Sequence, residues 1–194
     1  MRKFGFKKRK VRQSLMVAKS LTVLALNIDG LREPGRVLAL AAYAARAGAD
    51  ILIITETHLR SKEARALRVE GYEVVTEHSR EPNLTKMCGG VVILARVGIT
   101  CVELEKAPQL ALPLNSCSVL VYLHDNDLEA LKITGVYLPP KGAMTFEKLN
   151  KLTNSDSSAM IRGKRVGHLL GGDFNHPSWK KDFTKWQGLL ACGS

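Results

Sequence analysis

Side chains that can hold a metal ion or move a proton follow short apolar runs in this sequence. They are Asn27, Asp29, Glu56, Tyr137, Asp173 and Asn175. Short apolar runs bounded by polar residues predict buried strands, and ligands of open α/β sheets bind beyond the carboxyl ends of such strands. We therefore expect these side chains to share one site at the strand ends.

The oxygen-rich character of this set favours a site for a hard divalent cation. Mg²⁺ prefers oxygen ligands and keeps several waters, so one or two carboxylates and a substrate phosphate are enough to bind it. Glu56 is the strongest single candidate, because it ends the apolar run 50–55, where a solvated charge has no packing role. A capping or surface glutamate is the open alternative.

Asp173 stands in a short motif that suits close approach to a ligand. It follows two glycines and precedes Phe174 and Asn175. Glycine allows the backbone to turn sharply and to come near a ligand. A carboxylate there could orient or deprotonate an attacking water, and an adjacent amide could donate to a phosphoryl oxygen as charge builds. An Asx turn that closes a strand would use the same motif, so this alternative stays open.

The first part of the chain predicts a crossover unit that would position Asn27 and Glu56. Residues 21–26 and 50–55 predict two buried strands, and apolar residues at helical spacing between Pro34 and Gly48 predict a helix between them. A strand, a helix and a second strand in this order are typical of parallel pairing.

The following residues predict a short helix over 61–69, a strand over 72–76 and an exposed loop over 77–88. A series of strands without helices comes next and favours antiparallel pairing, at residues 89–96, 99–105, 116–124 and 130–137. The last expected elements are a helix around 146–152, a strand over 165–170 that leads into Asp173, and an amphipathic helix from 177 onward.

A basic arm of residues 1–20 precedes a single domain of residues 21–194. Residues 1–19 hold eight positive charges and no acid, which leaves +3 of the formal net charge of +11 for the rest of the chain. Such an arm binds polyanions, because each phosphate that it neutralises releases a counterion. The residues expected to contact nucleic acid, DNA above all, are Arg2, Lys3, Lys7, Lys8, Arg9, Lys10 and Arg12.

Other functions of the arm remain open. An anionic membrane surface, a solubilising tail and a targeting signal all fit basic clusters, and the absence of any acid before Asp29 also suits a mitochondrial presequence. We expect an intracellular protein, in the nucleus or alternatively the mitochondrion. The four cysteines form no CxxC pair, which favours reduced thiols. The longest apolar stretch, 37–54, is interrupted by Arg46 and Asp50 and is too polar to span a bilayer.

Five motifs occur in an order that is typical of one superfamily. They are LNIDGLR (26–32), TETHL (55–59), CGGVVIL (88–94), GVYLPP (135–140) and GGDFNHPSW (171–179). In these motifs the chain resembles the endonuclease/exonuclease/phosphatase superfamily, and within it the apurinic/apyrimidinic endonucleases and the endonuclease domains of non-LTR retrotransposons. The resemblance implies an α/β fold of two packed mixed β-sheets flanked by helices, the DNase I-like four-layer sandwich.

The resemblance also implies a metal centre in the first two motifs. Asn27 and Asp29 would lie by the metal, and Glu56 would be the principal ligand of Mg²⁺ or Mn²⁺.

The later motifs would supply the catalytic groups. Tyr137 would face the scissile phosphate, Asp173 would align the nucleophilic water, and Asn175 would stabilise the transition state. The implied activity is Mg²⁺-dependent phosphodiester hydrolysis of DNA.

The family pattern continues with a further acidic strand and a closing Ser-Asp-His segment, which this sequence does not contain. None of its five histidines stands in that context. His176 could act as a substitute acid or base, although a histidine before Pro177 also suits the start of a helix. We therefore expect a fold that is incomplete at the C-terminus and impaired hydrolysis. The alternatives are a non-catalytic retroelement remnant that binds nucleic acid and a phosphatase of the same superfamily.

Overall fold

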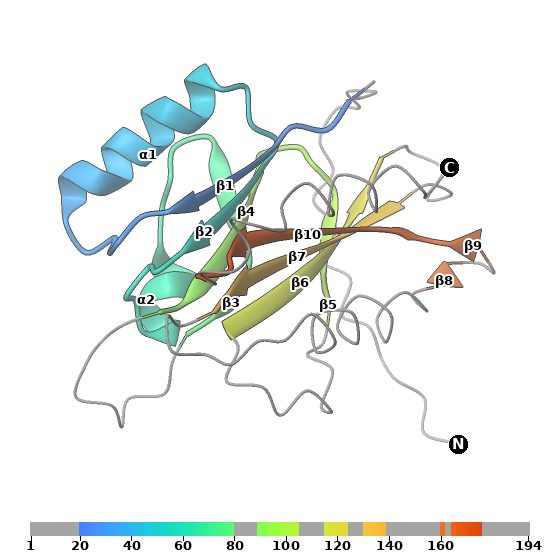
Figure 1. The fold of residues 1–194 in the computed structure, drawn as a ribbon. Helices are drawn as coiled ribbons and strands as arrows, with labels where there is room; N and C mark the ends of the chain where they lie inside the picture. Colours follow the sequence, from blue (N-terminus) through green and yellow to red (C-terminus); the bar gives the residue numbers. More distant parts are fainter. Residues whose placement is uncertain are drawn as a thin grey trace.

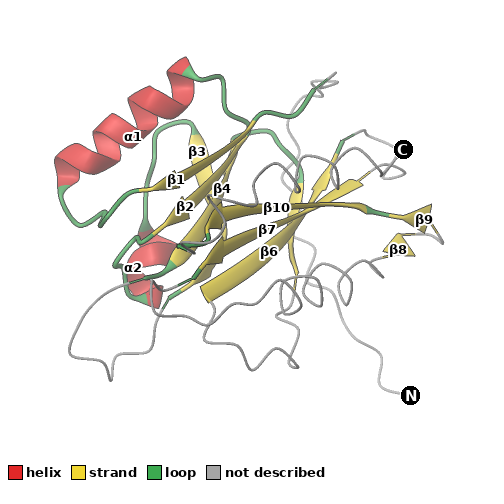
Figure 2. Ribbon diagram, viewed as in Figure 1, coloured by secondary structure: helices red, strands yellow, loops and turns green. Residues whose placement is uncertain are grey.

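The computed structural model describes residues 20–79, 89–104, 115–123, 130–138, 160–161 and 164–175. Within these residues the chain forms two helices, two four-stranded sheets and one two-stranded sheet (Figure 1). The two larger sheets pack face to face, and the helices lie on the outer side of one of them (Figure 2). The predicted α/β fold of two packed mixed sheets is therefore confirmed.

The first sheet has the strand order β1-β2-β4-β3. Its strands are β1 (Val23–Asn27), β2 (Ile51–Thr55), β4 (Val91–Arg96) and β3 (Tyr72–His78). β1 and β2 are parallel and α1 (Pro34–Arg46) connects them, as expected for a crossover unit. β4 pairs antiparallel with both β2 and β3.

The second sheet has the strand order β10-β7-β6-β5. Its strands are β10 (Gly167–Asp173), β7 (Ala130–Tyr137), β6 (Asn115–Tyr122) and β5 (Cys101–Leu104). The antiparallel pairing expected for the middle of the chain holds for β5, β6 and β7. β10 joins β7 in parallel, so that both strands end at the same edge.

The remaining described elements are short. They are α2 (Ser61–Ala66) and the antiparallel pair β8 (Met160–Ile161) and β9 (Lys164–Arg165). No helix within the described ranges has the length and apolar character needed to cross a membrane.

β2 is buried on both faces, which explains its uninterrupted apolar sequence. Leu52 and Ile54 point toward the helices and pack with Leu40 and Ala44 of α1. Ile51 and Ile53 point to the opposite side, because successive strand residues alternate between faces. These two side chains belong to the core between the sheets, whose other members include Val91, Ile93, Val119 and Ile133. Figure 1 shows β1, β2 and β4 between α1 and the second sheet.

Two predicted boundaries were wrong near α2. The helix ends at Ala66 rather than at residue 69, because Val69 instead forms an isolated bridge with Tyr72. β3 continues to His78, so Glu77, which we expected in an exposed loop, is a buried strand residue. Its carboxylate accepts hydrogen bonds there from Ser61 and Arg65 of α2 and from Ser79, which lets the strand extend. The helices expected around 146–152 and from 177 onward lie outside the described residues.

Candidate active site

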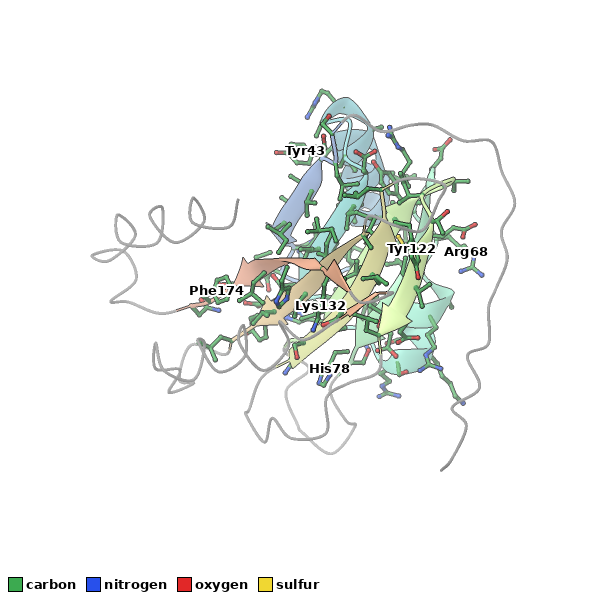
Figure 3. The ribbon with its side chains drawn as sticks, turned by 90° about the vertical axis from the view of Figure 1, so that its right-hand side faces the viewer. Tyr43, Arg68, His78, Tyr122, Lys132 and Phe174 are labelled. Carbon is green, nitrogen blue, oxygen red and sulfur yellow. The ribbon has the colours of Figure 1, made fainter. Side chains whose placement is uncertain are left out.

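The carboxyl ends of two parallel strand pairs meet at one place between the sheets. β1 and β2 end at Asn27 and Thr55, while β7 and β10 end at Tyr137 and Asp173. Figure 3 labels Phe174 at the end of β10, where it separates Asp173 from Asn175. The expected convergence of polar strand ends is therefore present in the fold.

Glycines allow the two sheets to approach closely near this end. A Cβ atom on Gly171 would lie 2.8 Å from Cδ1 of Ile53, and a Cβ on Gly135 would lie 2.9 Å from Cγ2 of Ile53. Side-chain carbon atoms do not pack at such distances, so any larger residue would push β7 or β10 away from β2. The glycines of GVYLPP and GGDFN thus set the distance between the halves of the site.

Asn27 connects these halves directly. Its Nδ2 atom donates to Oε1 of Glu56 at 2.9 Å and to Oδ2 of Asp173 at 2.6 Å. Its Oδ1 atom accepts the backbone N–H of Asp29 at 3.2 Å. One amide therefore binds the expected metal ligand and the expected water-aligning carboxylate, although Asn27 and Asp173 are 146 residues apart in the sequence.

Asp173 and Asn175 are held against each other at the end of β10. The backbone N–H of Asn175 donates to Oδ1 of Asp173 at 3.0 Å, which is an Asx turn. Nδ2 of Asn175 also donates to Oδ2 of Asp173 at 3.2 Å and to the carbonyl of Leu138 at 3.1 Å. The motif therefore forms the Asx turn, which fixes the carboxylate of Asp173, while the functional role of Asp173 stays a prediction.

Backbone strain is concentrated at this place. Among the described residues, the non-glycine residues with positive φ are Asp29 (48°), Glu56 (52°), His58 (55°) and Asn175 (39°). A left-handed conformation is unfavourable for residues with a Cβ and persists only where the surrounding structure enforces it, which often happens at functional sites. All these strained residues lie in the two loops and the strand end that form the site.

Backbone hydrogen bonds hold the two strained loops of the first sheet together. The N–H of Gly30 donates to the carbonyl of Glu56 at 2.7 Å, and the N–H of Leu31 donates to that of Thr57 at 3.0 Å. From α1, Nη1 of Arg36 donates to the carbonyl of Ile28 at 2.8 Å. The parallel pairing of β1 and β2 thus continues past the strand ends and keeps Asp29 beside Glu56.

Asp29, Glu56 and His58 form a cluster that could hold a metal ion. One ligand atom from each lies within 4.8 Å of the others. Octahedral ligands of Mg²⁺ at about 2.1 Å from the ion are about 3 to 4 Å apart, so the cluster fits a small divalent cation after minor adjustment. Asn27 adjoins the cluster through its hydrogen bond to Glu56.

His58 was missed by the sequence-based interpretation, which considered histidines only as members of a Ser-Asp-His segment or as a substitute for its acid or base. The signal that could have found it is its place in TETHL, two residues after Glu56. Both residues are left-handed, and this unusual backbone brings Nε2 of His58 to 3.6 Å from Oε2 of Glu56.

Tyr137 is buried beside Asp173, with only 4% of its surface exposed. Asn115, directly opposite on β6, accepts the N–H of Gly90 through Oδ1 at 2.9 Å. A Cβ on Gly89 would lie 3.2 Å from Cε1 of Tyr137 and 2.9 Å from Oδ1 of Asn115. Gly89 therefore packs against the tyrosine, and Asn115, which no motif indicated, anchors the neighbouring Gly90.

The other predicted site residues lie outside the described residues. They are the basic residues of the arm, Arg2, Lys3, Lys7, Lys8, Arg9, Lys10 and Arg12, and His176.

Two packed mixed sheets with polar strand ends between them define a DNase I-like fold. The family model of the Endonuclease/Exonuclease/phosphatase family matches residues 24–192 of the chain. The chain therefore belongs to this family, and the predicted superfamily is confirmed.

Solved structures of this superfamily share the fold. An endonuclease/exonuclease/phosphatase family protein from Bacteroides thetaiotaomicron has a TM-score of 0.56 and 19% identity, over 85% of this chain and 67% of that one. TDP2 from D. rerio, humanized by 14 mutations, has a TM-score of 0.56 and 17% identity, over 88% of this chain and 77% of that one. AP endonuclease LMAP from Leishmania major has a TM-score of 0.51 and 18% identity, over 79% of this chain and 54% of that one.

Proposed function

We propose that this chain hydrolyses phosphodiester bonds of DNA with the help of Mg²⁺ or Mn²⁺ at Asp29 and Glu56. The observation that carries the proposal is the amide of Asn27, which donates to both Glu56 and Asp173. Its hydrogen bonds connect the Asp29, Glu56 and His58 cluster, which could hold a cation, with the carboxylate of Asp173, which could align a water molecule. Metal-assisted hydrolysis of a phosphodiester uses these two functions side by side.

The residues of the chain divide the reaction between them. Asp173 accepts three N–H donors, two from Asn175 and one from Asn27, and a carboxylate offers about four lone-pair sites, so one remains for a water molecule. The oxygen of that water bonds to phosphorus while its proton passes to Asp173. The bond from phosphorus to the leaving deoxyribose oxygen breaks, and that oxygen takes a proton from solvent.

Other groups would act on the phosphate itself. A bound divalent cation would neutralise charge that develops on the phosphoryl oxygens. Tyr137 lies opposite Asp173 on the neighbouring strand and Asn175 follows two residues on, and this proximity supports a role for both in orienting the phosphate. Hydrogen bonds from Asn27 to Glu56 and from Asn175 to Leu138 and Asp173 hold these side chains preorganised, which is the condition for effective electrostatic stabilisation.

DNA is the substrate best supported by the sequence and by the structural relatives. The basic arm suits a polyanion, and GGDFNHPSW resembles the motif of retrotransposon endonucleases. One related structure is an AP endonuclease, and another is D. rerio TDP2 complexed with a single-strand DNA product. We therefore propose a retroelement-type or AP endonuclease-like activity, which would act in the nucleus.

The test is cleavage under single-turnover conditions, with protein in excess over supercoiled plasmid and over a labelled duplex with one abasic site. Wild type is compared with Glu56→Gln and Asp173→Asn in Mg²⁺ and in Mn²⁺. We expect metal-dependent cleavage that each substitution lowers by about 100-fold or more, because metal and water alignment act as one unit. The sequence-based expectation of impaired hydrolysis is tested by the absolute rate in the same assay.

His168→Gln is the matched control. His168 bonds to Oγ1 of Thr134 and lies five residues before Asp173 on β10, about 16 Å along the strand. This variant should cleave like wild type. DNA binding without cleavage would contradict the proposal in favour of a non-catalytic remnant, and hydrolysis of phosphomonoesters alone would contradict it in favour of a phosphatase.

A further inference from the structure

His58 presents a nitrogen atom to the carboxylates of the cation cluster. Nε2 is buried and has no hydrogen-bond partner among the described residues, although the side chain as a whole is 22% exposed. It lies 3.6 Å from Oε2 of Glu56, too far for a hydrogen bond. A buried polar atom without a partner is costly, so its orientation toward Asp29 and Glu56 requires a reason.

The surrounding backbone fixes the imidazole in this orientation. The N–H of His58 donates to the carbonyl of Gly89 at 3.1 Å. The other ring nitrogen, Nδ1, lies 3.3 Å from the position that a Cβ on Gly30 would occupy. His58 is thus held between the loop that carries Asp29 and Gly89, and Gly30 leaves the space that the ring needs.

We propose that His58 is a ligand of the divalent cation and makes the site selective for first-row transition metals over Mg²⁺. The inference rests on the proposed function, because it assumes the cation site at Asp29 and Glu56. Two carboxylates alone suit the hard Mg²⁺ ion, whereas an imidazole favours softer dications in the order Mn²⁺ below Co²⁺. A site with one nitrogen and two carboxylate ligands should therefore bind Co²⁺ more tightly than Mn²⁺, and Mn²⁺ more tightly than Mg²⁺.

The opposing explanation is that His58 only positions Glu56 by charge. In that case its removal would disturb every cation equally, because the carboxylate would be less well oriented for all of them. A nitrogen ligand makes a different prediction. Its removal should weaken Mn²⁺ and Co²⁺ binding strongly and Mg²⁺ binding little, so that the selectivity is lost.

The experiment measures cation binding by the full chain, independently of cleavage. Calorimetric titrations with Mg²⁺, Mn²⁺ and Co²⁺ are compared for wild type, His58→Asn, His58→Gln and the control His168→Gln. Asparagine tolerates the left-handed backbone of residue 58 better than most residues, so His58→Asn should keep the loop intact. Thermal unfolding of each variant, followed by circular dichroism, verifies that it is folded, and glutamine provides a second side chain if asparagine fails.

Wild type and His168→Gln should bind Mn²⁺ at least about 10-fold more tightly than Mg²⁺, and Co²⁺ more tightly still. In His58→Asn the ratio of Mn²⁺ to Mg²⁺ affinity should fall by about 10-fold, and pulsed electron paramagnetic resonance of bound Mn²⁺ should lose its imidazole nitrogen couplings. Equal weakening of all cations, or nitrogen couplings that persist in both His58 variants, would overturn the inference while leaving the proposed function intact. A wild-type chain that binds no cation would overturn the proposed function itself.

Discussion

Gly172, the residue before Asp173, is the position where one added methyl group should do the greatest damage. Its φ is +140°, and a Cβ would lie 1.9 Å from the carbonyl oxygen of Val136. Real Cβ atoms essentially never approach another atom within 3.0 Å, so β10 must shift away from β7. The hydrogen bond from the N–H of Leu138 to the carbonyl of Asp173, now 2.8 Å, lies next to this contact and would lengthen.

Two effects should lower the free energy of unfolding in Gly172→Ala. The backbone conformation is strained for any residue with a Cβ, by about 1–3 kcal/mol, and the overlap with Val136 adds about 1–3 kcal/mol. Together they are a large fraction of the roughly 5–15 kcal/mol that stabilises a typical domain. Alanine substitutions at two other glycines separate the backbone strain from the overlap with Val136. Gly98 has φ +100° and nothing near its Cβ position, whereas Gly35 lies in α1 with open space and no positive φ.

Urea unfolding, followed by circular dichroism, measures the series. Gly35→Ala should raise the free energy of unfolding by up to about 1 kcal/mol, and Gly98→Ala should lower it by the strain alone. Gly172→Ala should lower it further and should also reduce DNA cleavage, because Asp173 moves away from Asn27. If Gly172→Ala costs no more than Gly98→Ala, the overlap relaxes without moving β10, and the reasoning about strand position is refuted.

Three further predictions concern other parts of the chain. Burial raises the pKa of Glu77, but hydrogen bonds from Ser79, Ser61 and Arg65 outweigh it and hold the pKa below its usual range. The stability that this carboxylate contributes should be complete above pH of about 4.3 and lost as the pH falls through the lowered pKa, so urea unfolding of Glu77→Gln and wild type should converge as the pH falls below that pKa. Asn115→Ala leaves the N–H of Gly90 without its acceptor and should lower the free energy of unfolding by about 1–3 kcal/mol. Deletion of residues 1–19 should flatten the salt dependence of DNA binding, whose slope is about −0.9 per phosphate contacted; an unchanged slope would place the DNA contacts in the domain.

The sequence was most informative where local pattern and burial agree. The apolar runs before Asn27 and Glu56 predicted β1 and β2, their parallel pairing and the meeting of their polar ends. A short, uninterrupted apolar run is typical of a strand that is buried on both faces, as β2 is. Asp173 was likewise placed at a strand end. The parallel pairing of β10 with β7 was not predicted, because it joins segments that are distant in the chain and depends on the close packing that Gly135 and Gly171 permit.

The residues that escaped prediction depend on tertiary contacts. His58 faces the carboxylates only because Glu56 and His58 both adopt left-handed backbone conformations, which sequence pattern does not reveal. Glu77 was expected in a loop because the stretch 77–88 is polar and contains the turn residues Pro82 and Asn83. It instead continues β3 because Ser61 and Arg65 of α2 pack above it and satisfy the carboxylate.

The division of the site between two sheets has a functional consequence. Asp29, Glu56 and His58 all belong to loops of the first sheet, which backbone hydrogen bonds bind to each other. Asp173 belongs to the second sheet, and its distance from those loops is set by the core between the sheets. In the proposed function, cation binding would therefore depend on one sheet, whereas alignment of a water with the cation would depend on both. Asn27 connects the two sheets at this site, because its amide nitrogen donates both to Glu56 of the first sheet's loops and to Asp173 of the second sheet.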